Sequence, residues 1–325
     1  VKMERIFIFA LTLAMVLAMS IFDTEWQNWK AIYGKEYSSL QEEWFRRAIW
    51  EKTKKEVLEH NRLADLGIKS YWTELNHFAD MTSDELMSKG CLLPPGLQED
   101  IAEEFNNRTD VIKIPAIDWR NKHCVTPVKN QLSCNSCWIF AAVGVVESRY
   151  CIQYKKLYSL SEQQVLDCAG KGCDFGNPKD TWNYINKAGG IMKEDDYAYT
   201  GKNESCRFIL SKSCMRVNIT YGDLANEEDL ANEVAHHGPV VIGMNMSDLF
   251  SKYNGEGVFY EEECNAEKKH VVVVVGYNTT EGGDDYWIIK NSWGTEWGNK
   301  GYAYIRRNVN LCDMKKYIFK AEISK

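Results

Sequence analysis

The sequence of 325 residues lacks an excess of basic residues, and this absence bears on its partners. Lysine and arginine number 39 against 46 aspartate and glutamate residues, which gives a formal net charge of −7. Proteins that bind nucleic acid usually present a strongly basic face. We therefore expect no nucleic-acid partner.

The sequence also lacks an apolar run long enough to cross a bilayer, which takes about 20 residues. The N-terminal run from Ile6 to Ala18 is shorter, follows the basic residues Lys2 and Arg5, and precedes Ser20 in a small-x-small pattern. This combination is typical of a secretory signal peptide. The alternative is a buried or interfacial helix. We expect a signal peptide over residues 1–20, no stable membrane insertion, and a lysosomal or extracellular protein.

Five Asn-x-Ser/Thr sequons fit entry into the secretory pathway, where such sites in surface loops are glycosylated. The asparagine in the apolar stretch, Asn245, is the least expected to be modified. The sequons begin at Asn107, Asn203, Asn218, Asn245 and Asn278.

The chain divides into a charged helical part, a linker and a compact part. The apolar spacing predicts a long helix over residues 39–66, followed by a short strand over residues 71–78. Gly90, Pro94, Pro95 and Gly96 with several acidic residues indicate a linker over residues 90–112. No internal repeat or low-complexity segment is apparent.

Beyond residue 114 the pattern predicts helices first and a sheet second, an α+β organisation. Residues 137–154 form an apolar helix, and Ser161 with Gln164 three positions later is a helix-capping pattern. Three strand candidates lie between glycine-rich turns, at residues 271–275, 286–289 and 302–305.

Eleven cysteines are present, so full pairing would leave at least one thiol over. Cys137 opens the predicted apolar helix, where the backbone amides favour a thiolate, the nucleophilic form of cysteine. A cysteine hydrolase also needs an imidazole and a group that orients it. His270, at the start of a run of five valines, and Asn291, just after a strand, are the candidates. A hydrogen-bonded core histidine is the alternative for His270.

Cys134 and Cys137 also form a Cys-x-x-Cys pair, which admits a redox motif or half of a zinc site. No second such pair exists, and no βαβ pattern precedes this one. We expect neither a metal nor a cofactor.

Several blocks of the sequence together resemble one family, the papain-like cysteine proteases, close to cathepsins L, S and K. The Cys-x-x-Cys-Trp block, with His270 and Asn291 downstream, matches the family signature in order and approximate spacing. Further matching blocks begin at Asp118, Val125, Leu160, Asp167 and Asn291. The resemblance implies a two-lobed fold with a helical left lobe, a β-barrel-like right lobe and a helical inhibitory propeptide.

The resemblance implies a cysteine endopeptidase that is synthesised as an inactive zymogen and hydrolyses proteins and peptides. Cys137 resembles the nucleophile, His270 the general acid and base, and Asn291 the residue that orients the imidazole. The Gln131 side chain, with the Cys137 backbone N–H, resembles the oxyanion hole, and Trp293 resembles the residue that packs over the His–Asn bond. A binding or regulatory protein that has lost activity remains the alternative, because glycines usual around the active-site loop are replaced.

The N-terminal part resembles the family's inhibitory propeptide. Its two motifs match at Glu42, Arg46, Trp50, Val57 and Asn61, and then at Asn76, Phe78 and Asp80, with Thr53 and Glu74 as departures. The implied boundaries are a propeptide over residues 21–112 and a peptidase domain over residues 113–325. Its own propeptide is the implied inhibitor, cystatin-like inhibitors are further candidate partners, and we expect a monomer.

The family's three disulfides map onto six cysteines and leave Cys124, Cys151 and Cys214 unpaired in the peptidase part. The implied pairs are Cys134–Cys173, Cys168–Cys206 and Cys264–Cys312. For Cys91, a contact with one of the unpaired cysteines has no support in the sequence.

The resemblance implies a pocket for the second residue before the scissile bond, here suited to small or medium aliphatic side chains because Tyr317 is a bulky floor. Its implied lining residues are Asn177, Pro178, Gly243, Lys268, Val271 and Tyr317, and the Gly176 backbone is expected to pair with the substrate. Leu132, Asn135 and Phe175 depart from the family pattern nearby. Lys269, just before His270, predicts a lower upper limit of the activity–pH profile, because a cation disfavours the imidazolium.

Overall fold

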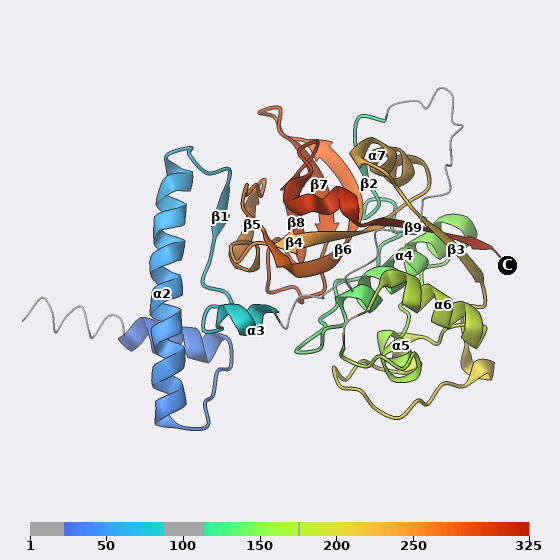
Figure 1. Ribbon diagram of the computed structural model, residues 1–325, viewed down its shortest axis with the longest axis horizontal. Coiled ribbons are helices and arrows are strands. Elements are labelled where there is room, and N and C mark those ends of the chain that lie inside the picture. Colours follow the sequence, from blue (N-terminus) through green and yellow to red (C-terminus); the bar gives the residue numbers. More distant parts are fainter. Residues whose placement is uncertain (1–22, 88–113, 175, 325) are drawn as a thin grey trace, which may run out of the picture.

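The computed structural model describes residues 23–87, 114–174 and 176–324. The expected signal peptide, the expected linker and Cys91 lie outside these ranges. Figure 1 shows three parts: an N-terminal segment (residues 23–87), a helical part and a sheet part. None of the helices within these ranges is long and apolar enough to cross a membrane.

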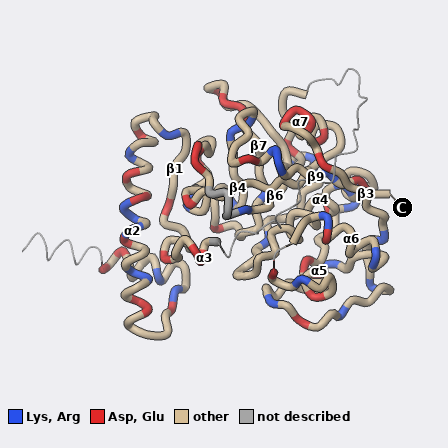
Figure 2. Tube along the Cα trace, in the orientation of Figure 1, with Lys and Arg blue, Asp and Glu red and all other residues tan. Residues whose placement is uncertain are grey.

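The N-terminal segment is a helical unit with its own small core. A helix over residues 23–32 crosses α2 (Leu40–Asp65) near one end of α2, and Trp26, Trp29 and Trp50 are buried where the two helices meet. The Ser39 side chain caps α2 by accepting from the Glu42 amide, as its residue type favours. Acidic and basic residues are interspersed along α2 (Figure 2).

The strand expected over residues 71–78 is shorter in the structure. β1 covers Tyr71–Thr73, and the chain then turns, because the Asn76 side chain accepts from the Phe78 amide. The turn leads into α3 (Ser83–Met87). The alternation of apolar residues beyond Thr73 therefore reflects a side-chain-stabilised turn and not a strand.

The helical part contains α4, which occupies the predicted residues Cys137–Tyr154, and two shorter helices. The predicted cap at Ser161 is confirmed, since its side chain accepts from the Gln164 amide. The Trp182 indole, fully buried, donates to the Ala142 carbonyl of α4 at 3.1 Å. The helices are α4 (Cys137–Tyr154), α5 (Glu162–Cys168) and α6 (Pro178–Ala188).

The sheet part is a seven-stranded antiparallel sheet in the order β3-β9-β4-β6-β7-β8, with β2 paired to β6. The expectation of a barrel-like lobe is corrected in one respect, because the edge strands β3 and β8 do not pair and the sheet stays open. Its strands are β2 (Ile117–Asp118), β3 (Asn218–Asp223), β4 (Val240–Met246), β6 (Asn265–Thr279), β7 (Asp285–Lys290), β8 (Tyr302–Arg306) and β9 (Ile318–Ser324).

The valine run of β6 is buried on both faces of this sheet. Val271, Val273 and Val275 pack with α4, whereas Val272 and Val274 pack in a second core on the opposite face. Side chains alternate between the faces of a strand, so a strand covered on both sides needs a continuous apolar run. This placement sets β6 against α4 and fixes the position of His270 at the start of the run.

The remaining elements connect these parts. β5 pairs with β1 in a separate two-stranded antiparallel sheet, which joins the N-terminal segment to the rest of the molecule. The connecting elements are α7 (Glu227–His236), β5 (Tyr253–Gly257) and four short 3₁₀ helices at Glu194–Asp196, Leu210–Lys212, Phe250–Lys252 and Leu311–Lys316.

Candidate active site

His270 and Asn291 form the polar centre of the candidate site. The His270 Nε2 atom lies 2.7 Å from the Asn291 Oδ1 atom, and both side chains are buried. His270 lies on β6, and Asn291 follows the end of β7, its neighbour in the sheet. The His270 Nδ1 atom has no hydrogen-bond partner within the described residues. One ring nitrogen is thus held by Asn291 while the other stays available.

Trp293 covers this pair. Its ring stacks on the His270 imidazole with centroids 4.5 Å apart and an angle of 25° between the planes. The Trp293 side chain is itself buried and meets Trp297 edge-on at 5.0 Å. Exclusion of water strengthens the electrostatic component of the His–Asn hydrogen bond.

Burial lowers the pKa of His270 to about 4, and the hydrogen bond to Asn291 opposes this shift. The direction agrees with the expectation for Lys269, but the cause differs. The Lys269 Nζ atom donates to the Tyr317 hydroxyl at 2.7 Å and lies over its ring at 4.7 Å. Burial, and not a neighbouring cation, therefore favours the neutral imidazole in this state.

Cys137 is the first residue of α4 and is fully buried. Cys137 belongs to the same buried cluster as Val271, the residue that follows His270 on β6. The Cys137 sulfur takes part in a disulfide in this structure. In this form no thiolate is available to stabilise an imidazolium, and reduction must precede nucleophilic attack.

Gln131 is tied to the segment that follows Asn291. Its backbone amide donates to the Ser292 carbonyl at 2.8 Å, and its Oε1 atom accepts from the Ser292 hydroxyl at 2.7 Å. The Nε2 atom donates to the Cys134 carbonyl at 3.0 Å. The Gln131 side chain is therefore fixed toward the loop that ends at Cys137. Ser292, which the sequence did not single out, provides this link.

The residues expected to line the pocket fall in two groups. Gly176 approaches the Trp138 ring so closely that an added Cβ atom would lie 2.3 Å from it, which excludes any side chain there. The Asn177 side chain caps α6 by accepting from the Lys179 amide at 2.9 Å, and Pro178 begins that helix. The Asn177 side chain is therefore occupied at the start of α6 and is 5% exposed.

The second group lies on the sheet. Gly243 of β4 pairs with Val271 of β6, and the Gly243 amide donates to the Tyr317 carbonyl at 2.7 Å. These three residues are therefore neighbours, as expected. The side chain of Lys268 lies outside the described part of the structure, as does Phe175.

The three expected disulfides are present, with Cα atoms 4.9–5.4 Å apart. The expectation that Cys124 and Cys151 are unpaired is wrong, since they form a fourth disulfide with Cα atoms 5.3 Å apart. A turn at His123, whose φ is +55°, directs Cys124 onto α4. Cys214 is free as expected, and burial raises its thiol pKa to about 11, which keeps it protonated and unreactive.

Leu132 occupies a backbone position that favours glycine. Its φ is +56°, and its side chain is 48% exposed and packs near Gly201. A left-handed conformation is costly for a residue with a branched apolar side chain. This departure places an apolar group beside Gln131 without blocking the contacts that Gln131 makes with Ser292.

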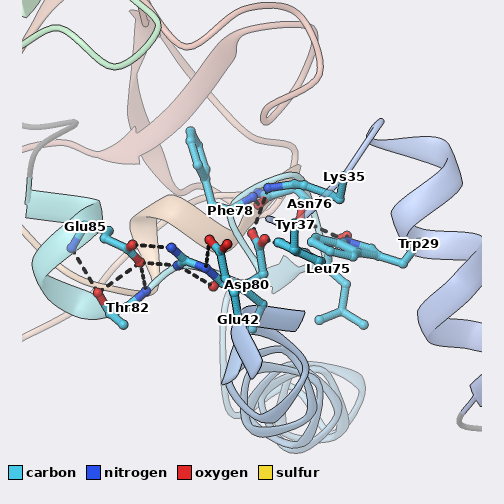
Figure 3. A network of polar contacts seen from close by, with 11 residues as sticks. Trp29, Lys35, Tyr37, Glu42, Leu75, Asn76, Phe78, Asp80, Thr82 and Glu85 are labelled. Atoms are coloured by element: carbon cyan, nitrogen blue, oxygen red, sulfur yellow. Dashed lines mark hydrogen bonds and ion pairs between the residues drawn. The ribbon is translucent and has the colours of Figure 1, made fainter. Parts of the chain in front are cut away.

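The N-terminal segment packs directly on the site. Phe78 is buried and meets the Trp293 ring edge-on with centroids 5.4 Å apart. The Asn76 side chain donates to the Ser251 carbonyl at 2.7 Å. Figure 3 shows Phe78 pointing away from the polar network of its own segment and toward the sheet part.

The polar network in Figure 3 holds the turn that presents Phe78. Arg46 of α2 binds both carboxylate oxygens of Glu85 at 2.6 Å and the Asp80 carbonyl at 3.3 Å. Asp80 in turn accepts from Lys35 at 2.7 Å and from Tyr37 at 2.9 Å. The pairing with Arg46 lowers the pKa of Glu85 to about 2.

Comparison with known proteins accounts for both halves of the chain. The profile of the papain family cysteine proteases matches residues 114–321, and that of the cathepsin propeptide inhibitor domain matches residues 26–86. The chain belongs to the papain family of cysteine proteases. It is a cysteine endopeptidase made as a zymogen, and its N-terminal segment is the inhibitory propeptide.

Similar proteins extend over nearly the whole chain. Cathepsin K of Mus musculus is 38% identical over 89% of this chain and 90% of its own length, and cathepsin S of Bos taurus is 37% identical over 91% of each. A digestive procathepsin L of Tenebrio molitor larval midgut has a TM-score of 0.82 at 33% identity, with 93% of this chain and 99% of that chain covered. The recombinant stem bromelain precursor has a TM-score of 0.79 at 27% identity, with 93% and 98% covered.

Proposed function

We propose that Cys137, His270, Asn291 and Gln131 carry out peptide-bond hydrolysis in this protease. The observation that carries the proposal is the buried pair of His270 Nε2 and Asn291 Oδ1 at 2.7 Å, with Nδ1 left unpartnered within the described residues. This division of the two ring nitrogens suits an imidazole that is oriented through one nitrogen and moves a proton through the other.

The reaction begins once Cys137 is reduced. The Cys137 thiol gives its proton to the His270 imidazole. The thiolate then attacks the carbonyl carbon of the scissile bond, and the carbonyl oxygen becomes an oxyanion that accepts hydrogen bonds from the Cys137 backbone N–H and the Gln131 side chain. The Gln131 Nε2 atom is an amide donor, and its hydrogen bond to the Cys134 carbonyl directs the side chain toward the loop that ends at Cys137.

His270 then protonates the leaving amine, the C–N bond breaks, and an acyl-enzyme thioester remains on Cys137. Water attacks the thioester carbonyl while His270 takes its proton, and the acid product leaves with the thiolate restored. Asn291 holds the ring orientation in both halves of the cycle without fixing a charge on it.

The test is incubation of the purified proenzyme in acid with a thiol reductant, followed by a peptidase assay. We expect cleavage near residues 108–114, activity in wild type, and labelling by an epoxide that alkylates active-site thiols. Cys137→Ser should abolish both the activity and the labelling, whereas Cys214→Ser, at the free half-buried thiol, should leave both intact. Absence of labelling in processed, reduced wild type would instead favour a regulatory protein without activity.

The substrate pocket proposed here consists of Gly176, Asn177, Pro178, Gly243, Val271 and Tyr317, with Trp293 beside the catalytic pair. The Tyr317 hydroxyl accepts from Lys269, which holds the Tyr317 side chain in place and supports its assignment as the bulky floor of the pocket. We expect preference for small or medium aliphatic side chains at the second position before the scissile bond. A peptide library that shows strong preference for phenylalanine there would contradict this.

The wider setting of the enzyme follows from the same assignment. Residues 1–20 are proposed as a signal peptide, residues 21–112 as the complete propeptide and residues 113–325 as the mature enzyme. We expect a monomer in the secretory pathway, either lysosomal or secreted, with cystatin-like proteins as further inhibitors. N-terminal sequencing of the mature enzyme and light scattering would test the boundaries and the monomeric state.

A further inference from the structure

Five charged and polar side chains form a cluster between the segments that carry the proposed catalytic groups: Thr126, Lys129, Glu147, Glu162 and Lys290. Lys129 donates to Glu147 at 3.0 Å and to both carboxylate oxygens of Glu162 at 2.7 and 2.9 Å. Both glutamates are 1% exposed. Thr126, also buried, donates its hydroxyl proton to Glu147, and Lys290 donates to that hydroxyl at 2.8 Å.

Thr126 is the group through which Lys290 reaches this cluster. Within the described residues, the Thr126 hydroxyl is the one hydrogen-bond acceptor of the Lys290 amino group, and Lys290 has no ion pair there. A hydroxyl carries one proton and two lone pairs. Because that proton is directed to Glu147, the hydroxyl oxygen is oriented to accept from Lys290, and the chain of donors has a fixed direction.

The three segments that meet at this hydroxyl each carry a proposed catalytic group. Thr126 begins the stretch that leads to Gln131, Glu147 lies on α4 whose first residue is Cys137, and Lys290 directly precedes Asn291. Two backbone hydrogen bonds extend the same link, from the Gln131 amide to Ser292 at 2.8 Å and from the Gly294 amide to Lys129 at 3.1 Å.

The buried setting makes loss of this link costly. A cavity of about 20 Å³ lies beside the cluster and is lined by Lys129, Glu147, Glu162, Lys290 and Asn291 among others. Burial lowers the pKa of Lys290 to about 8, partly offset by Glu147 and Glu162, while Lys129 adds to the lowering. An ammonium in such a place is costly without its hydrogen-bond acceptor.

We propose that Thr126 is a positioning residue for the hydrolytic reaction: its hydroxyl, held between Lys290 and Glu147, fixes the Gln131 segment relative to Cys137 and Asn291. This rests on the proposed function, since it assigns no reacting atom to Thr126. Its effect is on oxyanion stabilisation, which depends on where the Gln131 amide stands, and much less on the thiolate–imidazole pair.

The test compares Thr126→Val, which keeps the shape of the side chain but removes the hydroxyl, with Thr126→Ser, which keeps the hydroxyl. Each proenzyme is processed, reduced and titrated for active thiol. For Thr126→Val we expect kcat for a peptide amide to fall roughly 10- to 100-fold with KM changed less than about threefold, the scale of a misplaced oxyanion donor. Thr126→Ser should recover kcat to within about threefold of wild type.

A second measurement separates positioning from general damage. Alkylation by iodoacetamide needs the Cys137 thiolate but no oxyanion hole, so its rate in Thr126→Val should stay within about threefold of wild type. Equal losses in alkylation and hydrolysis, unchanged hydrolysis in Thr126→Val, or failure of Thr126→Ser to recover would each overturn the proposal.

Lys290→Met and Lys290→Arg give the same comparison from the donor side if Thr126→Val does not fold. We expect Lys290→Met to show the kcat loss with retained alkylation, and Lys290→Arg to recover part of it; hydrolysis by Lys290→Met at the wild-type rate would overturn the proposal. An inactive wild-type enzyme would refute the proposed function itself, whereas an active wild type with unaffected variants refutes only the role of Thr126.

Discussion

Within the propeptide, Phe78 is the residue whose truncation should most directly release the enzyme from inhibition. It is 5% exposed and meets the Trp293 ring edge-on at 5.4 Å, and Trp293 stacks on His270. We expect Phe78→Ala to raise the activity of the unprocessed proenzyme, because the propeptide loses its apolar contact over the catalytic pair while its own helical core is unchanged.

The magnitude follows from burial. Truncation of a buried phenylalanine to alanine costs about 3–5 kcal/mol. Phe78 also contacts its own segment, where it lines a cavity with residues such as Met81 and Leu86. If about half of the loss, roughly 2 kcal/mol, falls on the contact with the enzyme, the released fraction rises about 30-fold, since 1.4 kcal/mol corresponds to a factor of ten.

The assay is the initial rate of hydrolysis of a small peptide by reduced proenzyme near neutral pH, before any cleavage is visible on a gel. Phe45→Ala is the matched control, because Phe45 lies on α2 of the same propeptide and is 54% exposed. Thermal unfolding confirms that both variants are folded. Equal rates for Phe78→Ala and Phe45→Ala would refute the reasoning.

Three further predictions concern protons and glycans. Arg46 lowers the pKa of Glu85 to about 2, so this contact stabilises the propeptide above pH 4.5 and is lost as the pH falls toward 2. Glu85→Gln should therefore speed processing, measured on gels, most at pH 5–6. A processing rate equal to that of wild type would contradict this. Burial raises the pKa of Glu74 to about 7, so the neutral carboxyl favours the bound propeptide fully below pH 4.5, and this stabilisation disappears as the pH rises through 7. Because glutamine stays neutral, Glu74→Gln should make the proenzyme less active than wild type at pH 8. Asn245 is 6% exposed and its side chain donates to Asp313, so Asn245→Gln should leave the mass of protein expressed through the secretory pathway unchanged apart from the substitution.

The parts of the fold that the sequence predicts best are those whose cause is local. The helix Cys137–Tyr154 has the predicted bounds because an uninterrupted apolar run begins after the turn residues Asn135 and Ser136. The cap at Ser161 was predictable for the same reason, since donor and acceptor lie three residues apart. His270 and Asn291 were predictable as a pair only because their surrounding motifs resemble a family.

The parts that the sequence missed depend on contacts between distant segments. Cys124 and Cys151 pair because a left-handed residue, His123, turns the chain onto α4, and no local pattern announces such a turn. Lys269 precedes His270 in the sequence, but adjacent residues of a strand point to opposite faces, so the two side chains do not meet. Its charge therefore reaches Tyr317, and the low pKa of His270 has burial as its cause.

The propeptide combines two kinds of contact with different consequences for specificity. β1 joins the enzyme by main-chain pairing with β5, and Gly257 allows this approach, because an added Cβ atom would lie 2.2 Å from the Ser70 carbonyl. Main-chain pairing provides affinity but accepts many sequences. Recognition of this propeptide must therefore rest on side chains, among them Asn76 on the Ser251 carbonyl, Phe78 on Trp293, and the ion pairs Glu56–Lys252 and Lys69–Glu261. One of these side chains, Phe78, packs on Trp293, which stacks on His270, so this contact both identifies the propeptide and covers the catalytic pair.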